Sequence, residues 1–98
     1  MNVLDGHKLA EQRVQLANEF STLSEELGDI LTIKAARWAI LRADPECKSD
    51  TAAERKWQNT PEGLREMRIR LKLKAYEKQI ASLGTMLRTL ELEARNTI

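Results

Sequence analysis

Cysteine and histidine are scarce in this sequence of 98 residues, which holds one of each. A single cysteine, Cys47, cannot form a disulfide within the chain, and His7 has no second imidazole or thiol at the spacing of a zinc site. We therefore expect a reducing compartment, no metal and no cofactor. Cys47 is predicted to be a solvent-exposed free thiol, and His7 an exposed residue near a helix start.

The residue patterns on which catalysis depends are also missing. The four glycines form no phosphate-binding loop. The acidic residues are spread along the sequence as surface partners of lysine and arginine, and long helices offer no deep pocket in which to desolvate a catalytic group. We expect no catalytic residues and a protein that is not an enzyme.

No charge of one sign dominates, because 16 basic residues face 15 acidic ones for a net charge of +1. This balance argues against a DNA mimic and against a non-specific nucleic-acid binder. No apolar run approaches the ~18 residues of a membrane span, and the N-terminus shows no signal-peptide core. We expect a protein that remains in the cytoplasm in which it is made, with no membrane contact.

Helix-forming residues make up most of what is present. Aromatic residues account for only 4% of the chain and charged residues for 32%, so the core is expected to be a thin seam of leucine and isoleucine. Both prolines, Pro45 and Pro61, fall in the middle and separate two long helical stretches. The sequence predicts one all-α domain over residues 1–98, with long helices over 5–42 and 60–95 and a connection over 43–59 that holds a short helix near 50–58.

Local signals place the ends of these helices. Asp5 is the predicted N-cap of the first helix, and Ser49 or Asp50 that of the short helix. Thr60 precedes Pro61, the arrangement of an N-cap followed by the first helical residue. Residues 67–74 alternate strictly between apolar and basic, as in a strand, but the upstream cap and the downstream pattern favour helix.

Each long helix carries an apolar stripe. In the first it consists of Leu9, Leu16, Phe20, Leu23, Leu27, Ile30, Trp38 and Leu41. In the second, the residues alternate in steps of four and three, as in a coiled-coil heptad: Ile69, Leu73, Tyr76, Ile80, Leu83, Leu87, Leu90 and Ala94. We predict a long antiparallel, coiled-coil-like hairpin, although the seam fits equally between two chains of a homodimer.

A second apolar patch lies opposite the heptad stripe on the second long helix. One interpretation is that Trp57 and the short helix cover this patch. The functional hypothesis is that the patch binds a partner protein, because an apolar centre with an arginine-rich rim is typical of binding surfaces. The predicted partner-binding residues are Leu64, Met67, Leu71, Arg68, Arg70, Lys74 and Trp57.

Two further hypotheses concern the basic stripe and the prolines. The stripe over residues 65–78 is either a solvated face that keeps the helix soluble or a site of phosphate contacts, which makes a DNA-binding accessory factor one alternative function. A self-associating coiled-coil module is the other. The bonds that precede Pro45 and Pro61 are candidate sites for a host prolyl isomerase, since such bonds adopt both isomers in mobile loops.

Two segments, ANEFSTLSEELG at 17–28 and ERKWQNTPEG at 54–63, give the sequence its resemblance to known proteins. The whole chain resembles the second anti-RecBCD proteins of temperate lambdoid phages that infect enteric bacteria, a family of small helical proteins from phage recombination regions. The resemblance implies a protein of the host cytoplasm that binds the host RecBCD helicase-nuclease through its RecC subunit. Such binding modifies the enzyme, protects linear phage DNA and favours phage recombination.

Overall fold

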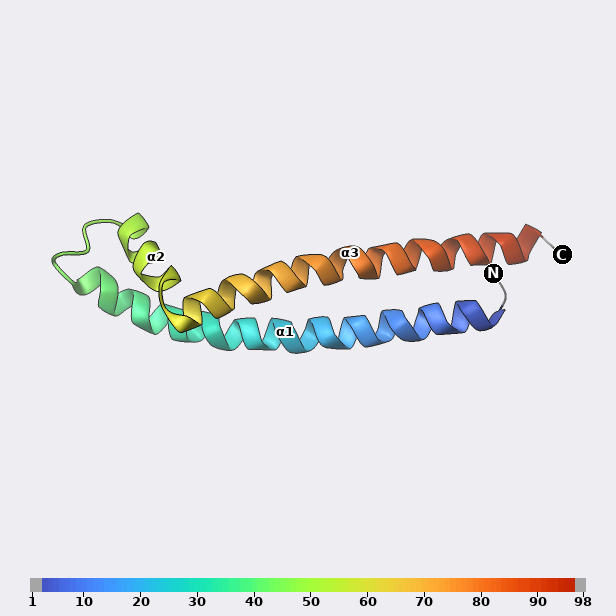
Figure 1. Cartoon of the computed structure of the whole chain (residues 1–98), viewed down its shortest axis with the longest axis horizontal. Helices are drawn as coiled ribbons and strands as arrows, with labels where there is room; N and C mark the ends of the chain where they lie inside the picture. The colour runs from blue at the N-terminus through green and yellow to red at the C-terminus, as the bar shows by residue number, and fades with distance from the viewer. Residues whose placement is uncertain (1–2, 97–98) are drawn as a thin grey trace. The chain divides into compact units, whose positions relative to one another are not determined.

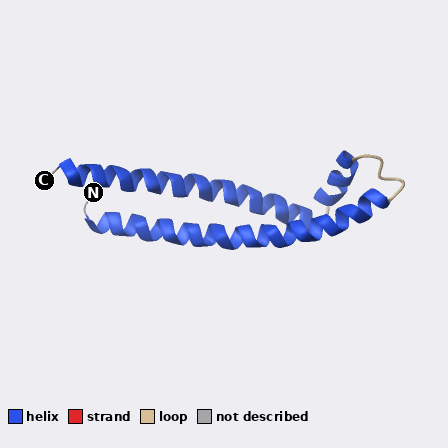
Figure 2. Cartoon of the chain, turned by 180° about the vertical axis from the view of Figure 1, so that it is seen from behind, coloured by secondary structure: helices blue, strands red, loops and turns tan. Residues whose placement is uncertain are grey.

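The computed structural model describes the backbone of residues 3–96. It consists of α1 (Val3–Ala43), α2 (Asp50–Gln58) and α3 (Pro61–Asn96), and these described residues form no strand (Figure 1). The fold is an all-α helical hairpin with a short helix in the connection, as predicted (Figure 2). Over residues 3–96, none of the helices has the length and apolar character needed to cross a membrane.

The start of α1 differs from the prediction. The helix begins at Val3, so Asp5 lies in its first turn and is not the N-cap. An acidic residue in the first turn still interacts favourably with the positive end of the helix dipole, so Asp5 marks the helix start without defining its first residue. At the other end, α1 stops at Ala43, shortly before Pro45.

Side-chain caps fix the two helices that follow. Ser49 is the N-cap of α2, and its Oγ accepts a hydrogen bond from the backbone N–H of Ala52 at 3.1 Å. Thr60 precedes α3, and its Oγ1 accepts from the backbone N–H of Gly63 at 3.0 Å. The residues from 67 to 74 are helical throughout. Both helices begin and end within one residue of the ranges expected from the sequence, α2 against 50–58 and α3 against 60–95.

The connection between α1 and α2 is a hydrogen-bonded turn. The backbone N–H of Cys47 donates to the carbonyl of Asp44 at 3.0 Å, and the Asp44 carboxylate accepts from the N–H of Glu46. Cys47 is a free thiol, but it is buried, with 4% of its surface exposed. The prediction of an exposed thiol is therefore wrong, because the turn directs Cys47 inward, where its Sγ lies 3.7 Å from the carbonyl oxygen of Ser49.

The chain divides into two compact units. Unit 1 takes its described residues from 3–22 and 73–96, and unit 2 is Leu23–Lys72. In unit 1 the first part of α1 and the last part of α3 lie side by side and run antiparallel (Figures 1 and 2). Unit 2 combines the second part of α1, all of α2 and the first part of α3.

The heptad seam closes within the chain. Its residues in unit 1, from Leu73 to Leu90, are all partly buried, while Ala94 is exposed. Tyr76, one of these seam residues, hydrogen bonds to Glu19 of α1, so the seam side of α3 faces α1 in unit 1. Ile69, the seam residue of unit 2, is 4% exposed. The seam that was also compatible with a homodimer thus has an intramolecular partner in each unit.

Candidate partner-binding face

Trp57 is the best-buried large side chain of unit 2, with 1% of its surface exposed. Its predicted place among the partner-binding residues is therefore corrected, since a buried indole offers no surface to a partner. The indole turns inward because its N–H finds an acceptor there: Nε1 donates to Oε1 of Glu66 at 3.1 Å. Trp57 also leaves the second patch uncovered, so the covering alternative does not hold.

Glu66 is the buried carboxylate around which unit 2 is organised. It is 8% exposed and contacts residues from all three helices. Besides the α2 indole, Lys34 of α1 lies 3.2 Å from Oε1, and Arg70 of α3 donates to Oε2 at 3.2 Å. Lys34 also pairs with Glu54 at 3.2 Å and lies 5.8 Å from the centre of the Trp57 ring. A buried charge with several donors is tolerated, whereas an unpaired one is strongly destabilising.

The pKa of Glu66 reflects two opposing effects. Burial by itself raises this pKa, because desolvation disfavours the carboxylate. The hydrogen bonds from Lys34, Trp57 and Arg70 stabilise the charged form and outweigh burial, so the pKa lies below its ordinary value. Glu66 thus remains a carboxylate at neutral pH, and its surroundings give it no tendency to act as a proton donor there.

Close backbone contact brings α2 against the start of α3. A Cβ added at Gly63 would lie 2.0 Å from the carbonyl oxygen of Trp57 and 2.8 Å from its carbonyl carbon. Only glycine allows the two helices to approach this closely. The same carbonyl oxygen accepts a hydrogen bond from the Thr60 hydroxyl at 2.6 Å. These contacts fix the first turn of α3 and hence the direction in which its side chains point.

The side of α3 that carries Gly63, Glu66 and Ile69 packs inside unit 2, and the opposite side is exposed to solvent. Leu64 is 43% exposed, Met67 50% and Leu71 63%. The steps of three and four residues between them place all three on one side of the helix, away from the buried Ile69. We call these three residues the outer patch. The sequence correctly predicted that they lie apart from the heptad seam.

The basic residues around the outer patch fall into two groups. Arg65 forms an ion pair with Glu26, and Arg70 is paired with Glu66. Arg68 and Lys72 are exposed, and neither forms an ion pair or hydrogen bond with any residue from 3 to 96. Lys74, which was also predicted to bind the partner, is exposed but belongs to unit 1. The candidate face of unit 2 therefore ends at Lys72.

The two prolines lie in defined local structure. Pro61 is the first residue of α3, and Pro45 is an exposed residue of the turn after α1. Neither follows a cis peptide bond, and none occurs elsewhere in the described residues. The action of a prolyl isomerase at Pro45 or Pro61 stays a prediction.

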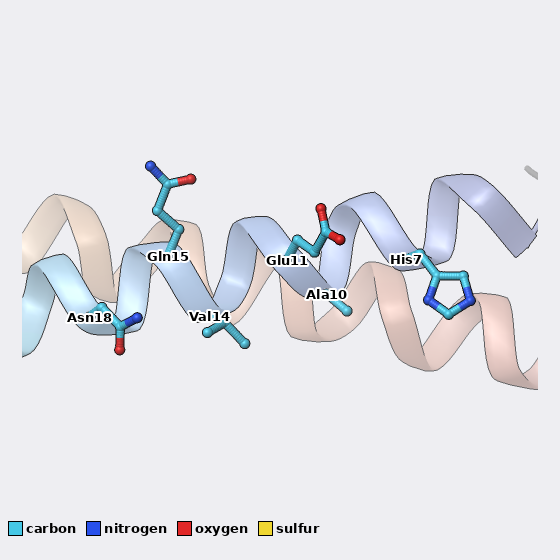
Figure 3. A pocket seen from close by; sticks show the side chains of 6 residues that line it. All are labelled: His7, Ala10, Glu11, Val14, Gln15 and Asn18. Carbon is cyan, nitrogen blue, oxygen red and sulfur yellow. The ribbon is translucent and has the colours of Figure 1, made fainter.

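The surface also has hollows that border α1. One follows a single side of α1 in unit 1 and is lined by His7, Ala10, Glu11, Val14, Gln15 and Asn18 (Figure 3). His7 is exposed there, as predicted. In unit 2, Trp38 borders two hollows between α1 and α2 together with Glu54. Sequence reasoning did not single out Trp38 as a surface residue, because its place in the α1 stripe indicated burial.

Comparisons with protein-family models, with curated proteins and with solved structures found no match to this chain. The candidate face therefore rests on the exposure, charge and spacing of its own residues.

Proposed function

We propose that this protein acts by docking the outer patch of α3 on a partner protein in the cytoplasm of its host. The observation that carries the proposal is the exposure of three large apolar side chains, Leu64, Met67 and Leu71, on one side of a helix whose other side is occupied. Exposed apolar groups rimmed by arginine are typical of interaction sites. A partner that covers them gains the free energy of removing apolar surface from water.

For the identity of the partner, we propose the host RecBCD helicase-nuclease, contacted through its RecC subunit. The resemblance of the sequence to second anti-RecBCD proteins of lambdoid phages supports this choice. On this proposal the protein modifies RecBCD so that linear phage DNA is protected and phage recombination is favoured. A contact made by apolar side chains suits a protein with a net charge of +1 better than imitation of DNA does.

The DNA-binding alternative gains little from the geometry. Of the four basic residues in α3 from 61 to 72, Arg65 and Arg70 are engaged in ion pairs with Glu26 and Glu66. Only Arg68 and Lys72 remain for phosphate groups in this segment, and three apolar side chains lie beside them. Each phosphate contact adds to the salt dependence of binding, so two bases in unit 2 support only weak attachment to DNA; Lys74 and Lys78, the other bases of the predicted stripe, belong to unit 1.

The test is capture from a nuclease-treated lysate of an enteric host, followed by binding to purified RecBCD. We expect the tagged protein to recover RecB, RecC and RecD, and we expect Leu71→Glu and Met67→Glu each to weaken binding by at least about tenfold. Leu92→Glu is the matched control, because Leu92 is a 58% exposed leucine on α3 outside the outer patch. Circular dichroism checks that all three variants keep their helicity.

Two results would contradict the proposal. Equal binding of RecBCD by the wild type, Leu71→Glu and Met67→Glu would exclude the outer patch as the docking site. Failure to bind purified RecBCD at all, with the protein folded, would exclude this partner. Recovery of nucleic acid that disappears with nuclease treatment would favour the DNA-binding alternative instead.

A further inference from the structure

We propose that the segment docking on the outer patch is an acidic amphipathic helix. It presents apolar side chains at alternating steps of three and four, and carboxylates four residues apart along one flank. This inference rests on the proposed docking function and adds the chemistry of the partner surface to it.

The helical form of the partner follows from the shape of the patch. Leu64, Met67 and Leu71 follow one another at steps of three and four, the spacing of a and d positions in a coiled coil. Such side chains form a narrow ridge with gaps between successive turns, into which the side chains of a second helix fit. Three partly exposed side chains also provide only a small apolar area, so one amphipathic helix is a sufficient partner.

The acidic character follows from the charges left over in unit 2. Residues 61–72 contain four basic side chains and two carboxylates. Both carboxylates are already paired: Glu62 lies 2.7 Å from Arg37, and Glu66 is surrounded by Lys34 and Arg70. The bases without a partner among residues 3–96 are Arg68 and Lys72. The outer patch therefore has positive charge beside it that nothing in unit 2 neutralises.

The arrangement of these two bases sets the spacing of the carboxylates. Arg68 and Lys72 are four residues apart, so they lie one turn apart on the same flank of the outer patch. The opposite flank carries Arg70, which is paired with Glu66 at 3.2 Å. A helix lying along the patch meets Arg68 and Lys72 with residues one turn apart on its own flank. Carboxylates at those two positions complete the contact.

A second copy of this chain, DNA and a lipid surface fit the same features less well. Two copies that joined their outer patches would bring Arg68 and Lys72 of one chain near those of the other, with no unpaired carboxylate between residues 61 and 72 to separate them. Phosphates of DNA would leave the three apolar side chains without a partner. A lipid surface takes up apolar side chains, but it does not distinguish one flank of the helix from the other.

The test uses two synthetic peptides of about three heptads with the same leucine pattern. One carries glutamate and the other lysine at the flanking positions, and both are titrated into the intact protein with fluorescence anisotropy and NMR shift mapping. We expect the glutamate peptide to bind at least about tenfold more tightly and to shift signals of residues 61–72. In the double variant Arg68→Glu/Lys72→Glu the preference reverses toward the lysine peptide. Arg88→Glu, an exposed base of α3 in unit 1, is the matched control and keeps the original preference.

Equal affinities for the two peptides, or shifts confined to residues outside 61–72, would overturn the inference. So would binding of a DNA duplex or of phosphatidylserine vesicles that depends on Arg68 and Lys72 when the glutamate peptide does not bind. The docking function is tested separately. If Leu71→Glu binds RecBCD as tightly as the wild type does, the outer patch is not the docking site. If Leu71→Glu abolishes RecBCD binding while Arg68→Glu/Lys72→Glu leaves it unchanged, the function stands and the acidic partner helix is excluded.

Discussion

Units 1 and 2 are built from the same two long helices, yet they bury their side chains differently. Each buried apolar side chain among the described residues belongs to unit 2: Ile30, Cys47, Ala53, Trp57 and Ile69. In unit 1 the seam residues remain only partly buried. The difference comes from α2, because two helices bury one stripe each at their contact, whereas a third helix closes the space beside them.

The two units also differ in how deeply they bury polar groups. Glu66 is buried in unit 2 because α1, α2 and α3 each supply a donor to it. In unit 1, Tyr76 hydrogen bonds to Glu19 across two helices, and neither residue is buried. These donors tie α1, α2 and α3 together behind the outer patch, which is the support that the proposed docking function requires. If α2 is the source of this difference, substitutions in unit 2 should cost more stability than matched substitutions in unit 1.

The largest effect is expected from Trp57→Ala. It removes the largest buried side chain of unit 2 and one donor to Glu66, so the free energy of unfolding falls by about 3–5 kcal/mol. Trp38→Ala is the matched control, because Trp38 is a partly exposed tryptophan of the same unit and its loss costs less. Urea unfolding followed by circular dichroism measures both. Equal losses for the two variants would contradict the central role of Trp57.

A second contrast comes from the same substitution made at one glycine in each unit. Gly63→Ala drives a Cβ into the backbone of Trp57 and is expected to destabilise the protein by about 3 kcal/mol, the upper end of overpacking. At Gly84 in unit 1, the atoms nearest to the new Cβ belong to the guanidinium of Arg13 at 3.4 Å, the end of a flexible side chain. Gly84→Ala is therefore expected to stabilise by about 0.5–1 kcal/mol through helix propensity. Thermal unfolding of the two variants should shift in opposite directions, and a shift in the same direction would refute the contrast.

The sequence predicted the helices well because their signals are local. Ser49 and Thr60 are caps whose partners lie within a few residues, and the heptad spacing from Ile69 onward is strictly periodic. Asp5 misled the prediction, since an acidic residue is favourable at several positions of the first turn. Cys47 misled it as well. Its charged neighbours suggested exposure, whereas the turn that buries it is set by contacts of the folded chain.

Only part of the candidate site was predicted, because the rest depends on contacts between helices and not on local spacing. Leu64, Met67 and Leu71 were separated from the seam by helical geometry, which depends on spacing alone. Burial of Trp57 depends on Glu66, nine residues away and on another helix, and on the close approach that Gly63 permits. No periodic pattern encodes that contact. The pairing of Arg70 with Glu66 follows the i,i+4 spacing, but that spacing does not indicate that Glu66 is buried.

A smaller effect separates two isoleucines of the same seam. Ile69 in unit 2 is 4% exposed, whereas Ile80 in unit 1 is only partly buried. We expect Ile69→Ala to lower the free energy of unfolding by about 2–3 kcal/mol and Ile80→Ala by about 1 kcal/mol, because less surface is returned to water at Ile80. Denaturant midpoints of the two variants measure the difference. Equal losses in the free energy of unfolding would show that the two units bury their seam residues to the same extent.

The smallest expected effect is a difference in the response to acid. The pKa of Glu66 is lowered in the folded protein, so its contribution to stability is complete above the ordinary value of 4.5 and is lost as the pH falls through the folded pKa. Glu62, whose hydrogen bond from Arg37 also lowers its pKa, acts in the same direction within unit 2. Tyr76 of unit 1 behaves in the opposite sense. Its pKa is raised by the hydrogen bond to Glu19, so that contribution is present below pH 10 and is lost as the pH rises through the folded pKa.

Hydrogen exchange over the described helices distinguishes these responses. Below pH 4.5, protection of α2 and the start of α3 should decrease before that of the seam in unit 1, because the carboxylates with lowered pKa lie in unit 2. Glu66→Gln should reduce this acid response, since its neutral amide does not titrate, while Glu11→Gln on the exposed surface of α1 should leave it unchanged. If Glu66→Gln keeps the full acid response, the carboxylate does not hold the three helices of unit 2 together, and its burial against Trp57 follows from packing alone.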